Sequence, residues 1–246
     1  MSYKYIHKDF ILTPIENVIK GAIYATHSIS NGVESYPLNA YIMQSLFLRM
    51  TGFQEQKLKC LSWELASNDF DYRVSYSKER GYSTYVDKRN LYKELIDLIL
   101  GIKSDYSSMN KTALEAIFDN SCKDVIELFS GEVIHTWNKR SFDTFKNIVS
   151  VRKADGVINN NSNNLKIKLT DQNEPFKGIY EKYLYRERNR IAHNTLSYQE
   201  NLPTFNSLKD MKNQFNNYFL FFTMLTIIDR VFIKLYKDYL DLLKSG

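Results

Sequence analysis

FNNYFLFFTMLTIIDRVFI, the stretch from residue 215 to residue 233, carries the strongest indication of the fold. Read as part of a helix that extends from about Ser207 to Leu243, it is apolar on much of its circumference. A helix with so wide an apolar surface is either central in a bundle or shared with a second subunit. Its uncharged part, residues 215–228, is shorter than the ~20 residues that cross a bilayer, so we expect no membrane span.

The composition of the whole chain is also typical of an all-α protein. Its 246 residues include only nine Gly and four Pro, fewer than the tight turns of sandwiches and barrels require. A hydrophobic fraction of 43% suffices for a sizeable core. We therefore predict an all-α bundle of about six to seven helices that forms a single domain over residues 1–246.

Composition divides this domain into three parts. In the first part, Thr13 and Glu16 have the spacing of a capping box, which predicts the start of a helix there. In the second part the run GVINNNSNN is mostly Asn and has too few apolar side chains to form a packed element, which indicates a loop. The predicted parts are N-terminal helices (1–155), a flexible loop (156–174), and a motif-bearing helix followed by the long final helix (175–246).

Cysteine content and charge limit the compartment and the partners. Cys60 and Cys122 are too few for a disulfide framework or a metal cluster, and Cys60 lies in an apolar helical pattern that predicts a buried free thiol. Together with an N-terminus that lacks a secretory signal, this favours the cytoplasm and predicts no cofactor. The net charge of +5 comes entirely from residues 151–246, with 15 Lys+Arg against 10 Asp+Glu, and is compatible with a nucleic-acid partner.

Catalytic residue types cluster at one place, the stretch YRERNRIAHN at residues 185–194. Here the sequence resembles the HEPN superfamily of helical ribonucleases, whose signature is an Arg, four to six residues and a His, often with Asn directly after the Arg. Arg188-Asn189 followed by His193 matches that form, and Arg186 to His193 matches the six-residue spacing. The resemblance covers this motif and the helical character of about the last 100 residues, and it assigns no subfamily.

The resemblance implies a metal-independent endoribonuclease that leaves 2′,3′-cyclic phosphate ends, in a toxin–antitoxin or antiphage setting. It implies an RNA substrate, a homodimer and a partner protein such as an antitoxin or defence component. One departure concerns that partner. Family members paired with a nucleotidyltransferase antitoxin often have a Tyr two residues after the His, whereas this chain has Thr195 and its nearest Tyr is Tyr198.

The predicted site contains no metal and is divided into two groups of residues. Its catalytic residues are Arg188, His193 and Asn189, and its substrate-binding residues are Arg186, Arg190, Asn194 and Lys182. On a regular helix Arg186, Asn189, Arg190 and His193 lie within about 80° of one another, whereas Arg188 lies about 140° from His193. Either the helix loosens before His193, or the long Arg188 side chain reaches round, or Arg186 acts in its place.

Two other functional classes fit the same residues. The first is a non-catalytic helical module that binds RNA, a nucleotide or a protein through the same groove. The second is a purely structural dimer, in which the histidine caps a helix end and the arginines form ion pairs. A ribonuclease would cut RNA in EDTA, whereas a binding module would retain RNA in a salt-dependent way without cutting it.

Overall fold

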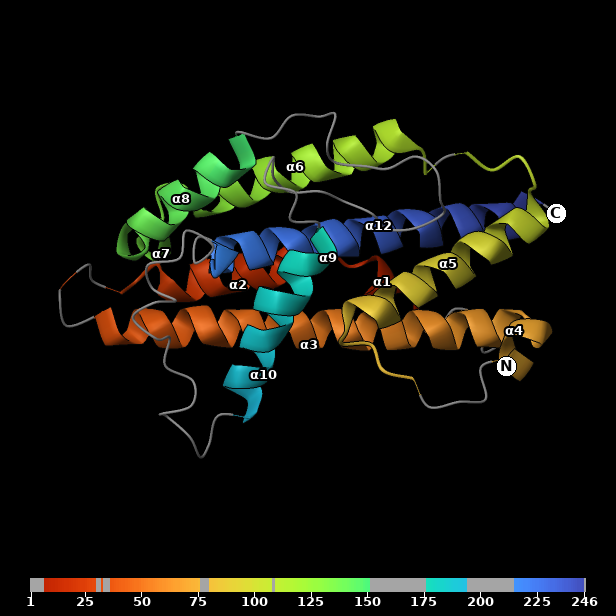
Figure 1. The fold of residues 1–246 in the computed structure, drawn as a ribbon, viewed down its shortest axis with the longest axis horizontal. Helices are drawn as coiled ribbons and strands as arrows, with labels where there is room; N and C mark the ends of the chain where they lie inside the picture. The colour runs from red at the N-terminus through yellow and green to blue at the C-terminus, as the bar shows by residue number, and fades with distance from the viewer. Residues whose placement is uncertain are drawn as a thin grey trace.

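The chain folds into helices that pack around one long central helix (Figure 1). The computed structural model describes residues 7–29, 32, 36–75, 80–107, 109–150, 176–193 and 215–245. Every regular element within these ranges is a helix, which confirms the all-α prediction. The elements are α1 (Lys8–Leu12), α2 (Glu16–Thr26), α3 (Tyr36–Asn68), α4 (Phe70–Ser75), α5 (Tyr85–Ile102), α6 (Lys111–Phe129), α7 (Val133–Trp137), α8 (Lys139–Ser150), α9 (Phe176–Ile179), the π-helix η3 (Tyr180–Tyr185), α10 (Arg186–His193) and α12 (Tyr218–Ser245).

Helix α12 lies at the centre of this arrangement. It packs against α3, α5, α6 and α8, and α1 and η3 also contact it. Every residue from Phe219 to Ile228 is at most 1% exposed. Of the two placements predicted for this helix, the central one is therefore correct. Its apolar circumference is covered within the chain, so it no longer supports a second subunit at this surface.

Aromatic side chains fill the contact between α12 and the helices α6 and α8. The ring of Phe219 lies 5.0 Å from that of Phe129 and 5.0 Å from that of Phe142, in both cases edge to face. Phe129 also stacks on Phe222 at 5.7 Å. Such ring pairs contribute about 0.5–1.5 kcal/mol beyond the area that they bury. These aromatic side chains are therefore part of the hydrophobic core.

Helix α12 begins later than predicted, immediately after Asn217. The side-chain oxygen of Asn217 accepts the N–H of Phe219 at 3.0 Å, and its amide donates to the carbonyl of Ser141 at 2.7 Å. A short polar side chain that accepts a free N–H commonly starts a helix. The predicted start near Ser207 and the predicted loop at 156–174 lie outside the described residues.

The start of α2 differs from the predicted capping box. The hydroxyl of Thr13 donates to the carbonyl of Asp9 at 2.7 Å and caps nothing in α2. Instead, the N–H of Ile15 donates to Asp229 of α12 at 2.9 Å, and the Glu16 side chain pairs with a cation of α12. Tertiary contacts therefore replace the local cap.

Two further findings concern the cysteines and the membrane. Cys60 and Cys122 are both buried free thiols, which confirms the prediction for Cys60. No helix within the described ranges has the length and apolar character that crossing a membrane requires.

Candidate functional site

The motif lies on a helix that crosses α3 (Figure 1). Elements α9, η3 and α10 follow one another without a break, and α10 contacts α3. Phe176, Ile179, Tyr180 and Leu184 are each at most 2% exposed, so one side of this helix faces the core. The predicted motif-bearing helix is therefore present, and one of its sides is packed against the bundle.

The π-helical segment η3 precedes the motif directly. This geometry is rare and often lies beside functional sites. The motif itself is regular α-helix from Arg186 to His193, so one of the three alternatives for Arg188, that the helix loosens before His193, is wrong. Positions 188 and 193 are consequently about 140° apart, whereas positions 186 and 193 are only about 20° apart and share a face.

Arg188 faces α3 and forms an ion pair there. Its Nη2 lies 3.2 Å from Oε2 of Glu55, and its Nη1 donates to the side-chain oxygen of Asn189 at 3.1 Å. Both members of the pair are 25% exposed, so water screens them and the pair contributes about 0.2–1 kcal/mol. The contact ties α10 to α3 and partly neutralises this guanidinium.

Arg190 is held by a carboxylate on its own helix. Its Nε and Nη2 donate to Glu187 at 2.7 and 2.5 Å, and the hydroxyl of Tyr218 donates to the same carboxylate at 2.7 Å. Hydrogen bonding to Glu187 raises the pKa of Arg190, and burial raises the pKa of Tyr218. Arg190 therefore stays charged, in a fixed orientation, with 30% of its side chain exposed.

The other predicted site residues are distributed as follows. Arg186 and Lys182 are exposed, and Asn189 is half-buried. The side chain of His193 and the whole of Asn194 lie outside the described residues. The described part of the site is thus a basic surface on one helix, with two of its three motif arginines bound to carboxylates.

Three residues outside the predicted site complete this region. Glu55 and Tyr218 bind motif side chains, and Lys88 of α5, only 2% exposed, is near enough to Arg188 for that cation to disfavour its charged form. No local pattern connects Glu55 to a residue 133 positions away. Lys88 had a signal, because it lies three residues from both Tyr85 and Leu91 and so belongs to the apolar face of α5.

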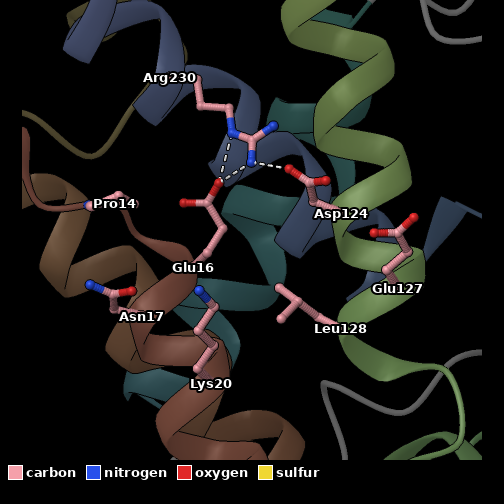
Figure 2. A pocket seen from close by; sticks show the side chains of 8 residues that line it. All are labelled: Pro14, Glu16, Asn17, Lys20, Asp124, Glu127, Leu128 and Arg230. Carbon is pink, nitrogen blue, oxygen red and sulfur yellow. Dashed lines mark hydrogen bonds and ion pairs between the residues drawn. The ribbon is translucent and has the colours of Figure 1, made fainter.

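Two hollows lie away from the motif. One, of about 450 Å³, lies between α2, α6 and α12, where Arg230 bridges Glu16 and Asp124 (Figure 2). The other, of about 560 Å³, lies between α4, α5 and the end of α12 and is rich in carboxylates. Neither is lined by a residue of α10. Within the described ranges, no three His, Cys, Asp or Glu side chains are grouped so as to hold a metal ion.

Comparisons of this chain with protein-family models, with curated proteins and with solved structures found no match. An all-α bundle by itself is compatible with many functions.

The hydroxyl of Tyr218 offers a direct test of how firmly α10 is attached to α12. Because this hydroxyl donates to a carboxylate that is 8% exposed, we expect Tyr218→Phe to lower the free energy of unfolding by about 1.5–3 kcal/mol. Urea denaturation measures this change. Tyr24→Phe is the matched control, since Tyr24 is 73% exposed. Equal stability of the Tyr218 variant and wild type would show that the hydrogen bond from Tyr218 to Glu187 does not hold α10 on α12.

Proposed function

We propose that this protein is a metal-independent endoribonuclease in which His193 transfers protons and an arginine of α10 binds the reacting phosphate. One observation carries the proposal. Arg186, Arg190 and position 193 share a face of a regular helix, and this face presents one exposed guanidinium and one that is fixed by Glu187. Such a face offers charge to a phosphate backbone, and position 193 on the same face belongs to a residue type that titrates near neutral pH.

The chemistry needs only these groups. The RNA 2′-oxygen loses its proton and forms a bond to the adjacent phosphorus, while the bond from phosphorus to the 5′-oxygen breaks and that oxygen gains a proton. An imidazole can take or give such a proton at neutral pH. A guanidinium stays protonated and stabilises the negative charge that develops on the phosphate oxygens. The products are a 2′,3′-cyclic phosphate and a 5′-OH end.

Arg186 and Arg188, the two arginines whose spacing to His193 matches the family signature, have different roles in this proposal. Arg186 binds the phosphate, because it is exposed and its position lies about 20° from position 193 on the helix. Arg188, which the resemblance favours, binds Glu55 and so holds α10 against α3. Asn189 contacts Arg188 and supports its orientation.

The biological setting follows the HEPN resemblance. One imidazole cannot act as acid and base at the same moment, so the proposal includes a homodimer that brings two motifs to one cleft. It also includes an antitoxin or defence partner that restrains the activity in the cytoplasm. Since residues 219–228 of α12 are buried within the bundle, this dimer uses a surface other than that apolar stretch.

A second candidate function is a non-catalytic module that binds RNA or protein through the same surface. The ion pairs favour it, because Glu55 and Glu187 partly neutralise two of the three motif arginines. A surface with reduced charge can still bind a partner without stabilising a transition state.

Cleavage of RNA in EDTA separates the two candidates. The full-length protein is incubated with end-labelled single-stranded RNA, with a 2′-O-methylated copy of the same RNA as the matched control. We expect cuts in the unmodified RNA alone, with 2′,3′-cyclic phosphate and 5′-OH ends, because the attacking group is the 2′-OH. Salt-dependent retention of RNA without any cut would instead establish a binding module.

A further inference from the structure

Lys88 is a buried lysine that the proposed reaction does not use. It lies in the first turn of α5, where the helix dipole disfavours a cation, and it is 2% exposed. Its Nζ donates to the carbonyls of Tyr82 and Ser83 at 2.7 and 3.1 Å. Both carbonyls immediately precede the N-cap of α5, Thr84. The hydrogen bonds therefore connect the side chain to the entry of its own helix.

The same carbonyl also anchors the helix that carries the motif. The hydroxyl of Tyr180, the first residue of η3, donates to the carbonyl of Ser83 at 3.0 Å. Nζ of Lys88 lies 5.2 Å from the centre of the Tyr180 ring. Tyr180 thus covers the ammonium group and shares an acceptor with it. If η3 and α10 moved away from the bundle, Lys88 would lose this cover and meet water.

The charges around Lys88 come from three helices. Glu55 of α3 and Asp87 of α5 favour its charged form, whereas Arg188 of α10 disfavours it. Burial is the strongest influence, and it lowers the pKa of Lys88 to about 7. A lysine in water has a pKa of about 10.4. Lys88 therefore loses its proton more readily when the motif helix is docked than when the helix is undocked and Lys88 meets water.

We propose that Lys88 is a positioning residue that makes the docking of η3 and α10 depend on protons, so that the motif helix is held more loosely at acidic pH than at alkaline pH. This device places α10, and with it Arg188, without touching a substrate. The proposal goes beyond the ribonuclease function, and its experiment needs no RNA. The two proposals can therefore fail separately.

The direction of the effect follows from proton linkage. Below pH 7 Lys88 carries its proton in both the docked and the undocked state, so docking there is weakest and does not vary with pH. Between about pH 7 and pH 10 only the undocked state keeps the proton. Rising pH then favours the docked state by up to about tenfold per pH unit.

Hydrogen–deuterium exchange of backbone amides between pH 6 and pH 9 tests this directly, with rates corrected for intrinsic exchange. We expect protection of the amides in residues 180–193 to rise by up to about tenfold per unit above pH 7 in wild type. Lys88→Met, which has a side chain of similar length without a charge, should show no such rise. Lys93→Met is the matched control, because Lys93 is exposed on the same helix, and it should behave as wild type.

A second variant keeps the test decisive if Lys88→Met folds poorly. Tyr180→Phe removes the hydroxyl bond to Ser83 and leaves Lys88 in place, so it should lower protection at every pH and retain the rise. Two results would overturn the proposal. One is protection in residues 180–193 that does not vary with pH in wild type. The other is an equal rise with pH in the amide protection of α12, which would link the proton to unfolding of the whole bundle.

Discussion

Asp229→Asn is expected to lower the free energy of unfolding by about 3–5 kcal/mol, the loss that accompanies removal of one member of a buried ion pair. Asp229 lies 2.5 Å from Nζ of Lys57, and their side chains are 0% and 1% exposed. Burial raises the pKa of Asp229 to about 6 and lowers the pKa of Lys57, so each charge depends on the other. The variant leaves the Lys57 ammonium buried without its counter-charge. Equilibrium denaturation in urea measures the loss.

Two controls separate the ion pair from a general effect of charge removal. Asp241→Asn also removes a carboxylate from α12, but that carboxylate is 74% exposed, and we expect stability within about 0.5 kcal/mol of wild type. The double variant Lys57→Met/Asp229→Leu should lose less than the sum of the two single losses, because no uncompensated charge remains. Additive losses would show that the two side chains act independently.

The importance of this pair lies in the segment that it holds. Nζ of Lys57 also donates to the carbonyl of Thr13, and Asp229 accepts the N–H of Ile15. The turn between α1 and α2 is therefore attached to both α3 and α12. The next residue of α12, Arg230, extends the attachment, because it bridges Glu16 of α2 and a carboxylate of α6 (Figure 2). These contacts fix α2 on the bundle.

The same segment shows how far the sequence could predict the fold. The wide apolar circumference of the final helix correctly indicated a central position, because a helix buried on all sides leaves that pattern in the sequence itself. The predicted capping box at Thr13 was wrong, because the Thr13 side chain caps no N–H of α2. Instead, Asp229, more than 200 residues away, accepts the N–H of Ile15 at the start of that helix. Local patterns report burial well, whereas they carry no information on partners from distant helices.

The candidate site shows a similar division. The sequence could place Arg186, Arg188 and His193 on one helix, since the apolar spacing before them is regular. It could not show that Arg188 binds Glu55, which comes from α3. Nor could it show the π-helical segment before the motif, because apolar spacing was interpreted with the period of a regular α-helix.

The largest effect on activity is expected from His193→Ala, which should lower the rate of RNA cleavage in EDTA by about 10²–10⁴-fold, the usual contribution of a group that transfers protons. Single-turnover assays with labelled RNA measure the rate of the chemical step. His27→Ala is the matched control, because His27 is exposed and belongs to α2's C-terminal end, away from the motif. Equal rates for His193→Ala and wild type would exclude this histidine from the reaction.

Substitutions of Arg186 and Arg188 should have different effects in the same assay. Because Arg186 is exposed, Arg186→Ala should leave the free energy of unfolding within about 0.5 kcal/mol of wild type and lower the cleavage rate by about 10²–10³-fold. Arg188→Ala breaks the pair with Glu55, so it should lower stability and cause the smaller loss of rate. Arg140→Ala, an exposed substitution on α8, controls for the loss of a positive charge. The opposite result would be that Arg188→Ala abolishes cleavage at wild-type stability while Arg186→Ala still cuts RNA. The phosphate would then be bound by Arg188, and that side chain would have to leave Glu55 of α3 before each turnover.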